Sequence, residues 1–367
     1  MSTSASLKNV IATKLLESDL MVARRFLGSI LADQENSVIP TFCMNNYLSL
    51  FIYESYRILK VIDPQRAALL AYSNEAVIEK ARHSVKLFDG SKVGHAGVLG
   101  DFTAIISAGR ERFLNNTWFP PARVLETDLG EWRYQSRLVT TTQVASFFMG
   151  IPTIATSDIP AIGRTLMTVA ESQARYVDQA TESLPWHGPS FMTTMKFGEL
   201  KSRDRRSERY FKRLYDPTLS DELTASLSAF RCSLNFLDVM LSADRTAASA
   251  ETMLKLRFIT LYHVLSSLTE LKAEYGSKLN STSLGLLNAI LSHKSSATIM
   301  HAEGRGFRNT LVHYTPEERV APRLSLSLPY YGLIEEYYPE HDFATLGQEI
   351  CEHTTRLAML LDEWERN

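Results

Sequence analysis

Apolar residues recur at three- and four-residue steps along most of this chain, and that spacing is the feature that most restricts its fold. A late stretch, for example, places Leu254, Phe258 and Leu261 on one stripe. Such a stripe gives a helix one apolar face that must be buried against another element. Only 17 glycines and 13 prolines occur among 367 residues, which is too little turn-forming material for a β-sandwich or barrel. The sequence therefore predicts a mainly α protein.

Capping residues place several helix boundaries. Asp63 before Pro64 predicts a helix start, because Asp accepts hydrogen bonds from free amide groups and Pro fits the first helical turn. Thr218 and Asp221 have the spacing of a capping box. The expected helices are about 7–31, 42–62, 64–88, 102–113, 157–184, 218–241, 248–275, 283–292, 308–314 and 343–364. Residues 118–157 stay open between short strands and broken helix.

A change in charge divides the chain. Residues 201–216 hold seven basic and three acidic side chains, whereas residues 217–367 hold 13 basic and 19 acidic ones. We therefore expect a mostly helical N-terminal domain of unknown role over residues 1–200, a basic linker over 201–216, and a C-terminal bundle of four or five helices over 217–367.

The overall charge and the apolar segments argue against two classes of protein. A net charge of −2 excludes a chain coated in positive charge for wrapping nucleic acid or covering a membrane. Residues 138–157 carry no charge, but threonines, a glutamine and Pro152 interrupt them, so we expect buried core there and no membrane contact. The first 14 residues lack the apolar segment of a signal peptide.

The cysteines and histidines predict neither a disulfide framework nor a metal site. Cys43, Cys232 and Cys351 lie far apart without a C-x-x-C pair, and the histidines form no zinc signature. We therefore expect a cytoplasmic protein without metal or cofactor.

One short segment carries a recognisable pattern. Arg308 is followed directly by the polar residue Asn309, and His313 comes after four intervening residues. This pattern resembles the signature of the HEPN superfamily. In that family the motif lies on a late helix of a small bundle, after two long antiparallel helices, and the segment has the same place within residues 217–367. The resemblance therefore predicts a HEPN-like C-terminal bundle.

A second Arg and His pair competes with this motif. Arg257 and His263 have similar spacing, but Phe258 follows the Arg and the pair lies in the middle of an expected helix, so it fails the pattern. Some toxin members of the family place Tyr two positions after the His, whereas here Tyr314 follows at once. That difference counts against a toxin assignment more than against the family.

The resemblance implies a metal-independent ribonuclease chemistry. In such a reaction the 2′-hydroxyl of RNA attacks the adjacent phosphate. His313 would move protons, Arg308 would offset phosphate charge, and Asn309 would hold a phosphate or orient the imidazole. DNA lacks the attacking hydroxyl, so the mechanism predicts RNA specificity.

The spacing of the motif also bears on oligomeric state. Residues five apart on an ideal α-helix point about 140° away from each other, so one helix does not bring Arg308 and His313 together. The resemblance implies that two copies facing each other across a two-fold axis build a shared cleft. We therefore predict a homodimer.

A second candidate site is the basic run. Its cations are Arg203, Arg205, Arg206, Arg209, Lys212 and Arg213. They are interleaved with Tyr210, Phe211 and Tyr215, so the segment is predicted to bind RNA, with phosphates on the cations and bases stacked on the rings. The alternative is a solvated linker or helix face.

Together these features predict a HEPN-type endoribonuclease of a prokaryotic defence or stress system, such as phage defence or a toxin–antitoxin pair. RNA is the expected substrate, and the N-terminal domain would select substrate, sense a trigger or restrain activity. A regulatory protein is a further expected partner. The alternative is a non-catalytic HEPN-like module that binds nucleotide, RNA or a protein. A third possibility is an antitoxin-like partner whose acidic C-terminal domain binds a basic protein.

Overall fold

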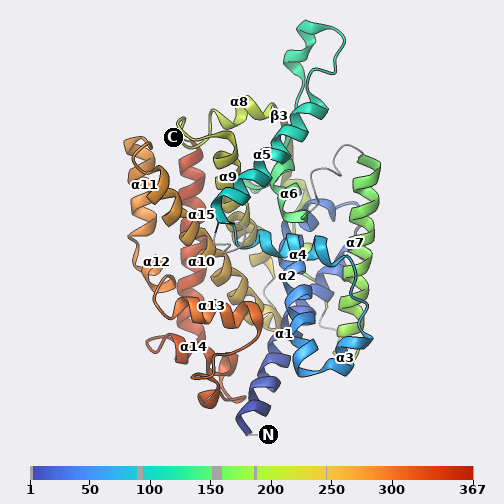
Figure 1. Cartoon of the computed structure of the whole chain (residues 1–367), viewed down its shortest axis with the longest axis vertical. Helices are drawn as coiled ribbons and strands as arrows, with labels where there is room; N and C mark the ends of the chain where they lie inside the picture. Colours follow the sequence, from blue (N-terminus) through green and yellow to red (C-terminus); the bar gives the residue numbers. More distant parts are fainter. Residues whose placement is uncertain (1–2, 89–93, 151–158, 186–187, 245, 367) are drawn as a thin grey trace.

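The computed structural model describes residues 3–88, 94–150, 159–185, 188–244 and 246–366, and it confirms a mainly α protein (Figure 1). The first half contains α1 (Thr3–Ala32), α2 (Val38–Ile62), α3 (Pro64–Leu69), α4 (Glu75–Ser84), α5 (Gly94–Phe113), α6 (Thr142–Met149) and α7 (Ile159–Ala180). The second half contains α8 (Ser207–Phe211), α9 (Asp221–Asn235), α10 (Ala250–Tyr275), α11 (Ser281–Leu291), α12 (Lys294–Ile299), α13 (Gly304–His313), α14 (Leu333–Tyr337) and α15 (Phe343–Arg366).

Two groups of helices organise the molecule. In the first half α1, α4, α6 and α7 pack around α2, which is buried along most of its length. In the second half α9, α10 and α15 pack against one another, and α10 and α15 lie on the opposite side of the molecule from α7 (Figure 1). α13 contacts both α10 and α2, so it lies where the two groups meet.

A small antiparallel sheet is inserted between the helices. β1 (Leu129–Tyr134) lies between β2 (Arg137–Thr141) and β3 (Leu200–Arg205). The β1–β2 turn passes through Gln135 and Ser136, whose φ values of 51° and 67° are those of a two-residue hairpin turn. Because side chains alternate along a strand, Gly130 and Trp132 lie on one face of β1 and Glu131 lies on the other.

The helix expected over residues 64–88 is wrong as a single element. Its start is confirmed, since Asp63 accepts a hydrogen bond from the amide of Arg66 at 3.1 Å. The chain then leaves the helix between α3 and α4 and places the ring of Tyr72 on that of Tyr56, with 4.1 Å between centroids. The break allows this aromatic contact, which a continuous helix does not provide.

The capping box at Thr218 is also wrong. The N-cap of α9 is Ser220, whose Oγ accepts from the amide of Leu223 at 3.5 Å. The Thr218 hydroxyl instead donates to Asp216 at 2.7 Å. Asp216, two positions before Thr218, thus takes the threonine hydroxyl that the capping box would have used.

The buried apolar side chains form one connected cluster that runs through both halves of the chain. Polar contacts also cross between them: the hydroxyls of Tyr47 and Thr260 lie 2.8 Å apart, and Lys255 donates to Asp19 at 2.5 Å. The residues expected as a linker form β3 and α8. The division into two domains stays a prediction.

The uncharged segment over residues 138–157 lies partly within the described residues. Leu138, Val139 and Val144 are fully buried, as expected for core, and residues 151–157 lie outside the described part. No helix within the described ranges has the length and apolar character that crossing a membrane requires.

A buried ionic network fixes the sheet to the second group of helices. Arg231 of α9 is 1% exposed and pairs with Asp362 and Glu365 of α15, the latter at 2.5 Å. Arg133 of β1 donates to the same Glu365 at 2.6 Å. Burial raises the pKa of Glu365, but hydrogen bonds and charges from Arg231 and Arg133 outweigh it, so that pKa lies below its ordinary value.

We predict that Arg231→Met destabilises the protein by about 2–3 kcal/mol, because it removes the buried cation that Asp362 and Glu365 share, while Arg137 still pairs with Asp362 and Arg133 with Glu365. Lys212→Ala is the control, since the Lys212–Glu208 pair is exposed and worth less than about 1 kcal/mol. Urea denaturation of both variants measures the difference. Equal unfolding midpoints would contradict a stabilising role for the network.

Candidate functional site

His313 is the last residue of α13, and a rigid helix end holds it in place. Tyr314 follows with a φ of 56°, in the left-handed region, and ends the helix there. The Tyr314 hydroxyl donates to Asp19 at 2.7 Å, and the ammonium group of Lys255 lies 3.9 Å from the centroid of the tyrosine ring. The end of α13 is therefore anchored to α1 and α10.

The His313 imidazole is bound by a buried carboxylate from the first half of the chain. Its Nδ1 lies 2.8 Å from Oε2 of Glu54, whose side chain is 2% exposed, whereas the His313 side chain is 39% exposed. The other Glu54 oxygen accepts from Nε of Arg82 at 2.6 Å. These three residues lie on α13, α2 and α4, so the contact brings three helices together.

The ionisation of Glu54 fixes the orientation of the imidazole. Burial raises the pKa of the Glu54 carboxyl, but the hydrogen bond from His313 and the charge of Arg82 outweigh it, and the pKa lies below its ordinary value. An ionised carboxylate only accepts hydrogen bonds, so Nδ1 of His313 carries the hydrogen. Nε2 is then the nitrogen that can accept a hydrogen bond.

His313 lies at a pocket of about 520 Å³, here called the His313 pocket. Its walls come from α2, α4, α5 and α6. Its charged and titratable lining residues are Tyr53, Arg57, Glu79, Lys80, Arg82, His83, Lys86, Asp101 and His313. Cations outnumber carboxylates in this lining, which favours an anionic ligand.

His83 is the second imidazole of the His313 pocket. Its Nδ1 lies 3.1 Å from Nη1 of Arg82, and because guanidinium only donates, this nitrogen accepts. Burial lowers the pKa of His83, and the charges of Arg82 and Lys86 lower it further. His83 is therefore neutral at pH 7, with its hydrogen on Nε2, 3.5 Å from Glu79.

The other two motif residues lie in a different environment. Arg308 is buried at 8% exposure, and its guanidinium carbon lies 5.0 Å from the centroid of the Tyr262 ring. Its Nη1 donates to the side chain of Asn309 at 3.0 Å. The structure thus places Arg308 beside Asn309, whereas His313 binds Glu54. Neither Arg308 nor Asn309 lines the His313 pocket.

Most of the predicted RNA-binding run forms a second pocket, of about 630 Å³, here called the arginine pocket. It is lined by Arg203, Arg205, Arg206, Arg209 and Arg213, together with Glu126, Asp204 and Glu365. Lys212 lies outside this lining and pairs with Glu208 at 2.8 Å. Tyr210, Phe211 and Tyr215, the rings expected to stack on bases, are all buried, and of the three only Tyr210 lines the arginine pocket.

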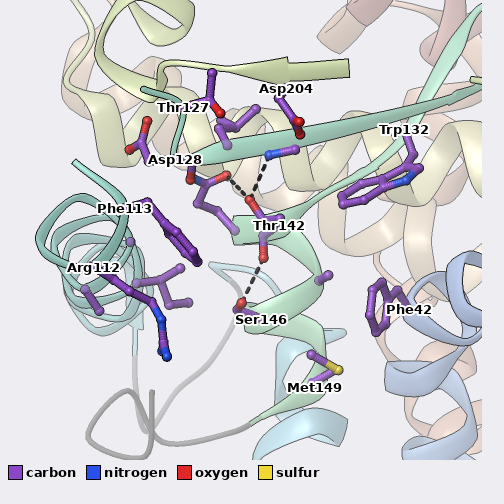
Figure 2. Close-up of a pocket in the computed structure, with 17 residues that line it drawn as sticks. Phe42, Arg112, Phe113, Thr127, Asp128, Trp132, Thr142, Ser146, Met149 and Asp204 are labelled. Carbon is purple, nitrogen blue, oxygen red and sulfur yellow. Dashed lines mark hydrogen bonds between the residues drawn. The ribbon is translucent and has the colours of Figure 1, made fainter. Parts of the chain in front are cut away.

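A third pocket, of about 470 Å³, is mostly apolar and lies between α5, α6 and β1; it is here called the Trp132 pocket. Figure 2 shows Trp132 and Phe42 on one side of it and Phe113, from α5, on the other. Thr142 accepts from the amide of Gly130 at 3.2 Å and ties α6 to β1 at the floor.

The sequence motif does not identify Glu54, Arg82 or His83 as site residues. Glu54 and His313 lie 259 positions apart in the sequence, so no local spacing reports their contact. The available signal is that Glu54 is the one acidic residue in the apolar helix α2. A buried acid on an apolar helix face requires a partner, although its sequence does not say which.

The pH dependence of stability tests the Glu54 contact. Because its pKa is lowered in the folded protein, ionised Glu54 stabilises the fold at neutral pH, and this contribution is lost as the pH falls through that pKa. We predict that Glu54→Gln lowers the free energy of unfolding at pH 7 and that the difference from the wild type shrinks below pH 4.5. A difference that stays constant from pH 7 to pH 3 would contradict an ionised Glu54.

Comparison of the chain with protein-family models, with curated proteins and with solved structures found no match. The residues and geometry of the sites themselves are therefore the basis for a functional assignment.

Proposed function

We propose that the protein is a metal-independent endoribonuclease whose general base is His313. The observation that carries the proposal is the contact between the buried, ionised Glu54 and Nδ1 of His313 at the edge of a cationic pocket. A carboxylate in this position fixes the tautomer of the imidazole and stabilises its protonated form, as proton transfer requires.

The reaction would proceed by attack of the RNA's own 2′-hydroxyl. Nε2 of His313 takes the hydroxyl proton while the oxygen forms a bond to phosphorus. The bond between phosphorus and the 5′-oxygen breaks, and that oxygen takes a proton from water. The products are a 2′,3′-cyclic phosphate and a 5′-hydroxyl end, and water is restored when His313 releases its proton.

The negative charge that develops on phosphorus requires cations. The resemblance to HEPN proteins assigns this task to Arg308, but Arg308 is buried beside Tyr262. We assign it instead to Arg57 and Lys86, which line the His313 pocket. The neutral His83 would add an N–H donor to a phosphate oxygen.

The arginine pocket supplies a second contact with the RNA in this proposal. Arg203, Arg209 and Arg213 are exposed and line it. One guanidinium group can bind two oxygens of a phosphate, so this surface suits the phosphate backbone of a polynucleotide.

The burial of Arg308 favours one alternative, a non-catalytic HEPN-like module that binds nucleotide, RNA or a protein. In that case the Glu54–Arg82–His313 contact holds the helices together and transfers no protons. A homodimer, a regulatory protein partner, a cytoplasmic location and a role in defence stay predictions from the sequence.

Cleavage of labelled RNA in excess EDTA tests the proposal. We predict that His313→Ala lowers the rate by about 100-fold or more, since general acid–base catalysis contributes about 10²–10⁴-fold. Glu54→Gln is expected to lower it by at least about 10-fold, because the carboxamide no longer fixes the tautomer. The product ends should be 2′,3′-cyclic phosphates.

Two further variants separate the alternatives. His301→Ala removes an exposed histidine near α13 and should leave the rate unchanged. Arg308→Ala distinguishes the two assignments of the phosphate-binding cation: loss of cleavage in a folded Arg308→Ala protein would overturn the assignment to Arg57 and Lys86. Normal activity in His313→Ala would overturn the proposal as a whole. No cleavage of varied RNAs by the wild type would favour the binding module.

A further inference from the structure

The arginine pocket and the Trp132 pocket meet at the edge of the sheet. Asp204 of β3 and Thr127, just before β1, line both of them. In the β1–β3 ladder Gly130 pairs with Asp204, and Glu131 pairs with Arg203. The Trp132 pocket therefore lies on the face of Gly130 and Asp204, and Arg203 and Arg205 lie on the face of Glu131, so the two pockets meet across the edge strand β3.

Aromatic rings line the Trp132 pocket from opposite sides. Phe113 lies across it from Trp132 and Phe42 (Figure 2). The absence of a side chain at Gly130 is required here, because a Cβ atom there would lie 2.8 Å from Cη2 of the Trp132 ring. A volume of about 470 Å³ falls within the range of small-molecule sites.

We propose that the Trp132 pocket receives an unpaired base of the RNA strand whose phosphates bind the arginine pocket. This inference rests on the proposed function and specifies its substrate as single-stranded. A base stacks on aromatic rings whatever its identity, while guanidinium groups follow the backbone. The Asp204 carboxylate, at the edge that the two pockets share, is an acceptor for an N–H group of the base.

Two exposed rings lie in the segment that joins Phe113 and Val124, residues that line the two pockets. Trp118 is 89% exposed and Phe119 50% exposed, and their ring centroids lie 5.8 Å apart. The segment that follows α5 forms the projection at the top of Figure 1 and joins Phe113 at the Trp132 pocket to Val124 at the arginine pocket. Arg123 donates to the carbonyl of Thr117 at 3.0 Å and holds a cation near these rings. Exposed aromatic and cationic groups together match single-stranded RNA.

Fluorescence anisotropy tests the inference with a labelled 12-nucleotide 2′-O-methyl RNA, whose blocked hydroxyl prevents cleavage. A second strand of equal length carries abasic residues and keeps the phosphates. We expect Trp132→Ala and Phe113→Ala to weaken binding of the first strand by about fivefold or more, and to leave binding of the abasic strand unchanged. Phe113 is 46% exposed, so Phe113→Ala is expected to fold and tests the inference even if Trp132→Ala is unstable.

The controls separate base from phosphate contacts. Arg209→Ala should weaken binding of both strands and reduce the salt dependence, whereas Lys14→Ala, on the exposed side of α1, should change neither. Equal loss on both strands in the ring variants, or a blunt duplex bound as tightly as the single strand, would overturn the inference. Cleavage activity is measured separately, so normal binding without cleavage overturns only the proposed nuclease.

Discussion

The Glu54 carboxylate is the contact on which the arrangement of the candidate site depends. It is buried on α2 and accepts hydrogen bonds from Arg82 on α4 and His313 on α13. A buried charge is tolerated only when its hydrogen-bonding capacity is used, so the carboxylate fixes the positions of both partners. Residues from opposite ends of the chain thereby form one wall of one pocket.

The helices of this protein could be predicted from sequence because their signals are local. Apolar spacing and the Asp63–Pro64 cap depend on residues within a few turns of each other. The sheet has no such signal: its hairpin turns through Gln135 and Ser136 where Asn-Gly is the usual pair, and β3 is rich in charge. β3 forms because it pairs with β1, about 70 positions away in the sequence, and its own residues do not predict a strand.

Some residues of the candidate site could likewise be predicted from the sequence, and others could not. His313 could be selected from the motif, and the calculated divergence along the helix agrees with the separate surroundings of Arg308 and His313. Glu54 and Arg82 could not be assigned to it, because their contact with His313 depends on how α2, α4 and α13 pack. The rings of Tyr210 and Phe211 illustrate the converse: their spacing suited base stacking, but packing of α8 onto α9 covers them.

Successive side chains of β1 lie in two different environments. Gly130 and Trp132 belong to the apolar pocket, while Glu131 and Arg133 belong to the ionic network beneath the arginines. Insertion or deletion of one amino acid here would exchange the two sets, burying carboxylate among aromatic rings and indole among guanidinium groups. Both environments therefore depend on the same alternation of side chains along β1. Insertions and deletions within β1 are expected to be far less tolerated than in the projecting loop beside it.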